Sequence, residues 1–260
     1  MRPGAPARRH PLTTQSRHAL VAGASGGIGR AVAVALAEAG LGVALVGRDH
    51  AKLEETRAAL GAAGENAPIL VCDVTDRAQV GSMVEAALAA LGSIDVLVCA
   101  TGVNVRQRSL RVLDPADWDR VILANLGAAF NLIHAVAPSM RVKGDGLVIQ
   151  MSSLAGVRAS HVAGAAYSAS KFGQAALGLV LGREERGRNL RSTLLHLGEV
   201  DTPLLDVRAA RPGGGEGAAP RREGILQPAD VARAVRFLVD LPPRAHVAEL
   251  VLKPTIDDFS

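Results

Sequence analysis

The sequence predicts an α/β fold in which a doubly wound parallel sheet carries helices on both faces. From His18 onward, short apolar runs alternate with longer segments of helical periodicity, which is typical of parallel strands joined by crossover helices. The runs are rich in Val, Ile and Leu, as strands that are buried on both faces require. A length of 260 residues, of which 48% are hydrophobic and 21% charged, fits a single globular domain from residue 18 to residue 260.

The predicted elements alternate along the chain. The seven strands are His18–Ala22, Gly42–Gly47, Pro68–Cys72, Ile94–Cys99, Gly146–Met151, Leu190–His196 and Ala248–Leu252. The six helices are Gly27–Ala39, Ala51–Ala63, Arg77–Leu91, Pro115–Val142, Ala165–Gly187 and Pro228–Leu241. A proline in the first turn loses no hydrogen bond and an acid there faces the positive helix end, so Pro228 and Asp230 mark the start of the last helix.

The segment Pro203–Gln227 breaks this alternation. It is long, holds four glycines between positions 213 and 217, and shows no sustained periodicity. A long loop inside a compact domain is usually a lid or a disordered insertion. Because this loop follows a strand end, where open α/β sheets bind ligands, we expect a substrate lid, and the disordered insertion is the alternative.

Residues 1–17 form a basic arm that we expect to be flexible. Its four arginines account for the formal charge of +4, and the remaining chain is neutral. A nucleic-acid groove needs basic residues clustered on the folded domain, so no nucleic-acid partner is expected. The arm lacks the apolar core of a signal peptide, and the longest apolar run, Ala31–Ala37, is too short to cross a bilayer. We therefore expect a cytoplasmic protein without a membrane partner; a transit peptide is the alternative.

The two cysteines and the seven histidines carry no sign of special chemistry. Cys72 and Cys99 fall on predicted strands that two others separate, about 14 Å apart, too far for a disulfide. The histidines are scattered without metal-ligand spacing. We expect two buried thiols in a reducing compartment and no metal.

The first predicted strand is followed directly by a glycine-rich run, Val21-Ala22-Gly23-Ala24-Ser25-Gly26-Gly27-Ile28-Gly29-Arg30. Glycines between a strand and a helix let backbone amides approach a pyrophosphate at the helix N-terminus. The run therefore predicts a Rossmann-type dinucleotide site at Gly23, Ser25, Gly27, Ile28 and Gly29. A tight turn that binds no ligand is the alternative. The glycine spacing resembles the TGxxxGxG pattern of the short-chain dehydrogenase/reductase family, with Ala22 in place of the threonine.

Gly47 and Arg48 stand at the end of the second strand, where family members that bind NAD commonly place an acid. A carboxylate there accepts the ribose hydroxyls but repels a 2′-phosphate, whereas a guanidinium binds a phosphate with two hydrogen bonds. Arg48 therefore predicts NADP(H) as the cofactor, and a solvated loop arginine is the alternative.

Two further turns resemble cofactor-binding turns of the family. Asp73 and Val74 follow the third strand, as does the family's adenine-contacting Asp, although nearby Asp76 fits a plain N-cap. The family's NNAG appears as Cys99-Ala100-Thr101-Gly102, which keeps only the glycine. We expect Cys99 and Gly102 to lie beside the cofactor with altered packing.

Tyr167 and Lys171 are four residues apart in a helical pattern and therefore share one helix face. A free phenol has a pKa near 10, and a neighbouring cation favours its phenolate. The YxxxK pattern alone has a high false-positive rate. Here Ser152-Ser153-Leu154-Ala155-Gly156 lies upstream at a strand end and resembles the family's SSxxG motif. Ser153 aligns with the catalytic serine, one position further from the tyrosine than in many members, and Ser152 is the alternative.

The resemblance covers about Ala19 to Thr202 and implies the catalytic roles. Tyr167 gives or takes the proton of the substrate oxygen while hydride moves at the nicotinamide. Ser153 hydrogen-bonds that oxygen, and Lys171 lowers the Tyr167 pKa and holds the nicotinamide ribose. Asn125, in the long fourth helix, completes the family's tetrad and holds a water that relays protons, although a mid-helix asparagine also fits a plain surface position.

The Leu197–Thr202 segment resembles the family's PGxVxT, in which Gly198, Val200 and Thr202 hold the carboxamide and Leu197 replaces the proline. The C-terminal part resembles serine and 3-hydroxy acid dehydrogenases. The family also implies a small alcohol or carbonyl substrate and a homotetramer or dimer built through Pro115–Val142 and Ala165–Gly187.

Two other functions stay open at this point. A dinucleotide-sensing regulator would keep the glycine run but would not need the tetrad, all four positions of which are present. A dehydratase or epimerase would use the same tyrosine and lysine with the cofactor as a transient hydride store.

Overall fold

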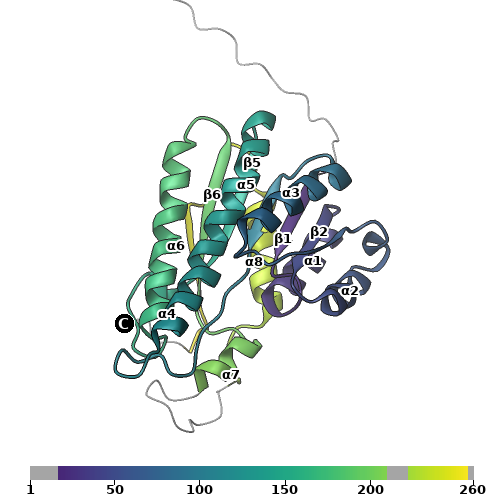
Figure 1. The fold of residues 1–260 in the computed structure, drawn as a ribbon. Helices are drawn as coiled ribbons and strands as arrows, with labels where there is room; N and C mark the ends of the chain where they lie inside the picture. Colours follow the sequence, from purple (N-terminus) through teal and green to yellow (C-terminus); the bar gives the residue numbers. More distant parts are fainter. Residues whose placement is uncertain (1–16, 210–221, 257–260) are drawn as a thin grey trace, which may run out of the picture.

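A computed structural model describes residues 17–209 and 222–256, in which one seven-stranded parallel sheet forms the centre (Figure 1). The strands are β1 (His18–Ala22), β2 (Gly42–Gly47), β3 (Ile69–Val71), β4 (Val96–Cys99), β5 (Gly146–Ser153), β6 (Leu190–Leu197) and β7 (Glu249–Leu252). Their order is β3-β2-β1-β4-β5-β6-β7, and every neighbouring pair is parallel. The order reverses between β1 and β4, the point at which doubly wound sheets bind ligands at their carboxyl ends. The predicted fold class is confirmed.

Helices cover both faces of the sheet (Figure 1). Five of these helices are α1 (Gly27–Glu38), α2 (His50–Ala59), α3 (Arg77–Leu91), α6 (Ala165–Glu184) and α8 (Pro228–Asp240). Short 3-10 turns lie at Gly61–Gly64 and Leu154–Gly156. Helices α1, α2 and α8 pack into one apolar cluster, and α3, α5 (Ala128–Lys143) and α6 into another on the opposite face.

Side chains that alternate along each strand divide the core between these two clusters. On β1, Val21 faces the α1 and α8 side, whereas Leu20 faces the α3 and α5 side, and all of these side chains are buried. A period of two in the buried residues is what strands between two helical layers require.

The long helix predicted at Pro115–Val142 is present, but it contains a wide turn. Helix α4 (Pro115–Ile122) leads into a π-helical turn (Leu123–Gly127), and α5 (Ala128–Lys143) continues from it. The segment from 115 to 143 has the length and composition that a membrane span needs, yet half of its apolar window is buried inside the protein. A core helix of a folded domain also combines this length and apolar composition with burial.

The expected loop from Pro203 needs a correction, because its first residues form helix α7 (Pro203–Ala209). Pro203 stands in its first turn, where no hydrogen bond is lost, and Asp206 faces the positive helix end. Residues 210–221 of the expected lid and residues 1–16 of the expected arm lie outside the described residues.

Cys72 and Cys99 are both buried and free, and β2 and β1 lie between β3 and β4 as expected. Burial raises the pKa of the Cys72 thiol to about 11 and that of the Cys99 thiol to about 12. Neither thiol is therefore ionised near neutral pH.

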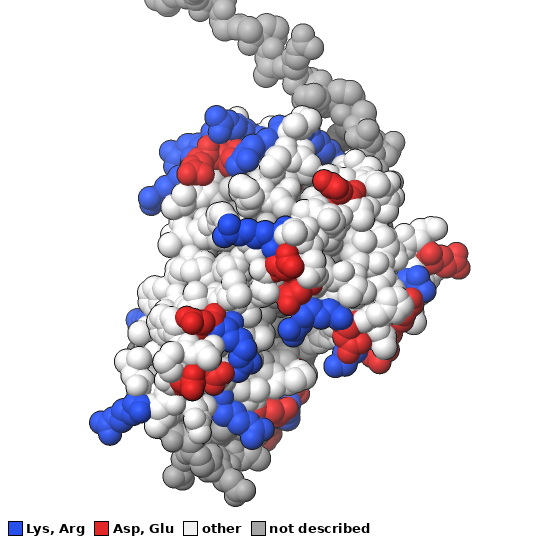
Figure 2. All heavy atoms as spheres, in the orientation of Figure 1, with Lys and Arg blue, Asp and Glu red and all other residues white. Residues whose placement is uncertain are grey.

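Charged side chains of both signs are interspersed on the face shown in Figure 2, and mainly uncharged residues lie over α6. The large exposed apolar side chains of α5 and α6 are Phe130, Val142, Phe172, Leu179 and Val180.

Candidate active site

A cavity of about 400 Å³ lies at the carboxyl ends of the central strands and runs from the end of β2 to the start of α6. Fourteen of the predicted site residues line it: Gly23, Ser25, Gly27, Ile28, Arg48, Asp73, Val74, Gly102, Ser153, Tyr167, Lys171, Gly198, Val200 and Thr202. Gly29, Cys99 and Asn125 do not line it.

The glycine run brings the start of α1 very close to the end of β1. A Cβ placed on Gly29 would lie 2.0 Å from the carbonyl oxygen of Gly23, so only glycine fits there. Gly29 thus packs against the backbone of the glycine run and does not line the cavity. The N-cap residue Gly26 offers no side chain to the first amides of α1, whereas aspartates cap α2, α3 and α4. Amides without a side-chain acceptor at a helix start fit a pyrophosphate.

The far end of the cavity is formed by the residues after β2 and β3. Arg48 is exposed there, and its charge helps to lower the pKa of Asp73. The larger causes are hydrogen bonds to Oδ1 of Asp73, which accepts from the backbone N of Thr75 at 3.0 Å and from its hydroxyl at 2.8 Å. An ionised acid and an exposed guanidinium therefore stand side by side at the mouth of the cavity.

Tyr167 and Lys171 lie on the first turns of α6 and are both buried, at 5% and 3% exposure. The Lys171 ammonium nitrogen lies 5.6 Å from the centre of the Tyr167 ring. It donates to the Met151 carbonyl at 2.8 Å and to the Gln174 side-chain oxygen at 2.7 Å. These two acceptors fix a buried ammonium beside the phenol, which is the arrangement that favours a phenolate.

Gln174 was missed by sequence reasoning. It is three residues after Lys171 and is itself buried, so it lies on the same face of α6. A polar residue at this spacing from a predicted catalytic lysine was the available signal.

Ser153 is the last residue of β5, and its hydroxyl accepts from the backbone N of Ala155 at 3.2 Å. The hydroxyl of its neighbour Ser152 is buried without a hydrogen-bond partner among the described residues. Both serines line the cavity, so the structure leaves both hydroxyls within the site.

Asn125 lies in the π-helical turn, and both the oxygen and the nitrogen of its side-chain amide hydrogen-bond to protein groups. Its oxygen accepts from the backbone N of Val103 at 2.7 Å, and its amide donates to the Val103 carbonyl at 3.1 Å and to the Ser170 hydroxyl at 2.9 Å. Ser170 in turn donates to the carbonyl of Tyr167 at 2.7 Å. Asn125 therefore ties the loop after β4 to the turn that carries Tyr167; its expected water stays a prediction.

The substrate side of the cavity is apolar. Tyr167 packs into a small cluster with Val105, Val121 and Ala166, and the partly buried Val103 and Leu204 lie against this cluster. Leu204 comes from α7, the helix that was not expected. The charged side chains among the described lining residues are Arg48, Asp73 and Lys171. Within the described chain, no group of three or more His, Cys, Asp or Glu side chains gathers closely enough to hold a metal ion.

An uncapped helix start at a switch point, next to a buried tyrosine and lysine, is the arrangement expected of a dinucleotide-binding α/β protein with an acid/base centre. The family model of the short chain dehydrogenases matches residues 17–212. The chain belongs to the short-chain dehydrogenase/reductase family and is an oxidoreductase of that family.

Three known proteins illustrate the similarity. Glycine betaine reductase ATRR of Emericella nidulans is 34% identical over 96% of this chain, which spans only 19% of that protein. Cis-4-hydroxycyclohexanecarboxylate dehydrogenase of Sinomonas cyclohexanicum is 35% identical over 85% of this chain and 88% of its own length. The crystal structure of a metagenomic short-chain oxidoreductase in complex with NADP is 34% identical, covers 92% of this chain and 98% of its own, and superposes with a TM-score of 0.76. This similarity supports a nicotinamide dinucleotide as the cofactor.

Proposed function

We propose that this chain is an NADP(H)-dependent oxidoreductase that interconverts an alcohol and the corresponding ketone or aldehyde. The observation that carries the proposal is the single cavity lined by the glycine run, Arg48, Ser153, Tyr167 and Lys171. A sensor that only bound the dinucleotide would not need a phenol and a buried ammonium at the other end of that cavity.

The residues present fit the dinucleotide at both of its ends. The open space beside Gly26, where a Cβ would meet no heavy atom within 4 Å, and the uncapped start of α1 suit the pyrophosphate, and Arg48 suits a 2′-phosphate. The solved relative described above holds NADP, which supports the same choice here. Gly198, Val200 and Thr202 would hold the nicotinamide end.

Each catalytic side chain has one task in this proposal. When bound, the nicotinamide ring supplies or accepts the hydride. Tyr167 exchanges a proton with the substrate oxygen, so that the proton and the hydride move in the same net reaction. Lys171 favours the phenolate through its charge, and Ser153 donates a hydrogen bond to the same oxygen. The apolar wall at Val103 and Leu204 excludes water and receives the carbon skeleton.

The test is a panel of aldehydes, aliphatic ketones and cyclic keto acids, followed through loss of NADPH absorbance. The cyclic compounds enter the panel because of the relative that acts on a hydroxycyclohexane acid. Stoichiometric oxidation of NADPH with formation of the alcohol is expected. Turnover of a substrate without net change in the cofactor would instead indicate the dehydratase or epimerase reaction.

A homo-oligomer built through α5 and α6 is part of the proposal. Phe130, Phe172 and Val180 are 40%, 42% and 49% exposed on these helices, and burying them in a partner removes apolar surface from water. Light scattering of the purified protein is expected to give a dimer or tetramer, and a monomer at high concentration would contradict it.

A further inference from the structure

A buried hydrogen-bond network lies between α1 and α2, directly behind the glycine run. The hydroxyl of Thr56, on α2, has no exposed surface and accepts a hydrogen bond from Arg30 Nε, on α1, at 3.0 Å. The same hydroxyl oxygen lies 2.8 Å from the carbonyl oxygen of Ala24 and 3.0 Å from that of Lys52. One threonine hydroxyl therefore joins both helices to the glycine run.

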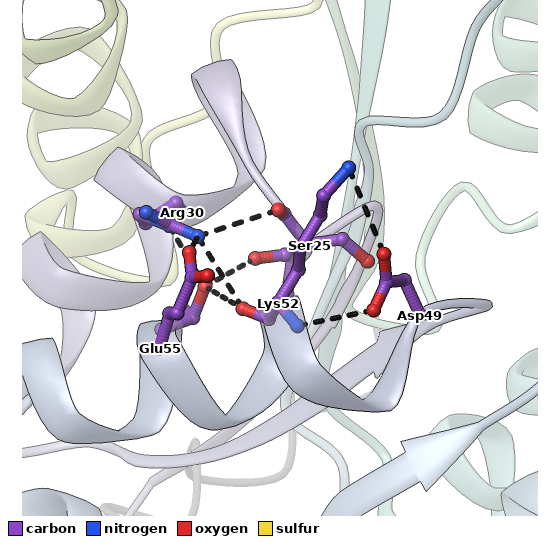
Figure 3. A network of polar contacts seen from close by, with 7 residues as sticks. Ser25, Arg30, Asp49, Lys52 and Glu55 are labelled. Carbon is purple, nitrogen blue, oxygen red and sulfur yellow. Dashed lines mark hydrogen bonds and ion pairs between the residues drawn. The ribbon is translucent and has the colours of Figure 1, made fainter.

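Arg30 reaches the next carbonyl of the run as well. Figure 3 shows its guanidinium between α1 and α2, close to Glu55, Lys52 and the Ser25 backbone. Its Nη2 donates to Glu55 at 2.7 Å and lies 3.4 Å from the Lys52 carbonyl and 3.5 Å from the Ser25 carbonyl. Arg30 and Thr56 thus face the consecutive carbonyls of Ala24 and Ser25.

The opposite side of the run is held by β2. The backbone N atoms of Gly23 and Ala24 both donate to the carbonyl of Val46, at 2.9 and 3.0 Å. These bonds need no particular side chain, whereas the bonds on the carbonyl side exist only because residue 30 is an arginine and residue 56 a threonine. The side chains therefore fix the other edge of the run, which the backbone bonds to β2 leave free to shift.

The position of Ser25 matters because its hydroxyl occupies the end of β2. A Cβ on Gly47 would lie 2.0 Å from the Ser25 hydroxyl oxygen, so a side chain at position 47 would require this hydroxyl to turn away. Arg48 follows immediately. Ser25 and Arg48 thus flank the spot where NAD-binding and NADP-binding sites differ, and a small shift of the run changes the distance between them.

We propose that Arg30 and Thr56 are positioning residues that set the 2′-phosphate subsite by holding the carbonyls of Ala24 and Ser25. The proposal rests on the NADP(H) preference proposed above. Neither residue touches the cofactor in this account. Their effect is on the ratio of the NADPH and NADH dissociation constants, because only the phosphate senses the spacing of the Ser25 hydroxyl and the Arg48 guanidinium.

The experiment measures both dissociation constants by cofactor fluorescence titration without substrate. Thr56→Val keeps the shape of the side chain but removes the hydroxyl, and Thr56→Ser keeps the hydroxyl. Arg57→Gln is the matched control, since Arg57 lies next in α2 and pairs with Glu54 on the surface. Thr56→Val is expected to lower the NADPH preference about fivefold to tenfold, the change that one or two hydrogen bonds produce in an equilibrium constant. Thr56→Ser and Arg57→Gln are expected to keep the wild-type ratio.

Arg30→Gln is the second variant, for the case that Thr56→Val does not fold. The Arg30 side chain is 35% exposed, so this change leaves the buried hydroxyl in place and is expected to lower the preference in the same direction. A wild-type protein that prefers NADPH, together with an unchanged ratio in every folded variant of Thr56 and Arg30, overturns this proposal alone. An equal weakening of both cofactors by Thr56→Val also overturns it. A wild-type protein without NADPH preference overturns the cofactor assignment and this proposal with it.

Discussion

At Gly29, the structure predicts that adding a single methyl group produces a severe steric clash. The methyl group of Gly29→Ala would stand 2.0 Å from the carbonyl oxygen of Gly23 and 2.5 Å from its carbonyl carbon. Both are backbone atoms, so neither can rotate away as the end of a flexible side chain could. The first turn of α1 must instead move away from the glycine run.

The required movement is at least about 1 Å, because Cβ contacts closer than 3.0 Å are essentially never seen. Overpacking of this kind costs about 1–3 kcal/mol, and replacing a helical glycine with alanine returns about 0.5–1 kcal/mol. We therefore expect Gly29→Ala to lower the free energy of unfolding by about 1–2 kcal/mol, and the Tm by roughly 2–8 °C at this chain length. Loss of one hydrogen bond to a charged group costs about 1.5–3 kcal/mol, so NADPH affinity is expected to fall about 10- to 100-fold.

Gly81→Ala is the matched control. Gly81 lies within α3, and a Cβ there meets no heavy atom within 4 Å. The same chemical change is thus expected to raise stability by about 0.5–1 kcal/mol and to leave NADPH binding unchanged. Thermal unfolding and cofactor fluorescence titration measure both quantities. A Gly29→Ala protein that melts at or above the wild-type temperature and binds NADPH normally would refute the close approach of α1 to the run.

Three further predictions concern other parts of the protein. Arg48→Ala is expected to weaken NADPH binding about 10- to 100-fold, as loss of hydrogen bonds to a charged group does, and to leave NADH binding unchanged; an unchanged ratio contradicts the role of Arg48. Burial alone would raise the pKa of Asp95, but hydrogen bonds from Lys143, the His18 backbone and Ser93 lower it overall. The ionised Asp95 therefore stabilises the folded state above the unfolded pKa of about 3.9, and this contribution is lost as the pH falls below it. Urea unfolding is expected to show a free-energy difference between wild type and Asp95→Asn that shrinks below about pH 4. A difference that stays constant with pH would refute this. If the segment from 203 to 227 closes over the substrate, limited proteolysis within it slows only when NADPH and substrate are both present, whereas equal cleavage in the free, binary and ternary states argues against a lid.

The sheet and most of the helices were predictable because burial leaves a direct signature in the sequence. Runs such as Val96–Cys99 are apolar on both faces, and this pattern needs no knowledge of distant residues. Boundaries were less certain: β5 continues to Ser153 and β6 to Leu197, each beyond its predicted end. Strand ends depend on neighbouring strands, which a local pattern does not contain.

Two local features escaped prediction for different reasons. Helix α7 is only seven residues long, so Pro203 and Asp206 were its only start signals before a glycine-rich stretch. The π-helical turn at Asn125 widens the helix by its hydrogen bonds and leaves no trace in the apolar periodicity. The turn determines how Asn125 faces Val103 and Ser170, which is why its side-chain partners could not be anticipated.

The candidate site likewise contains residues that local sequence motifs predict and contacts that depend on tertiary packing. Residues in short motifs, such as Tyr167 with Lys171, could be named because four residues make one helix face. The contact between Arg30 and Thr56 joins residues 26 positions apart, and no spacing rule connects them. Only the packing of α1 against α2 brings their side chains together.

The central claim, that Tyr167 exchanges a proton with the substrate oxygen, is tested most directly by Tyr167→Phe. The measurement is kcat/KM for NADPH-dependent reduction of the best carbonyl compound from the panel, with NADPH affinity and Tm determined on the same preparations. The account predicts a loss of about 10²–10⁴-fold in kcat/KM, with affinity and Tm unchanged, because the phenol oxygen contributes to proton transfer and not to folding. A Tyr167→Phe protein that turns over within about threefold of wild type would contradict it, since general acid/base catalysis by that oxygen would then contribute almost nothing.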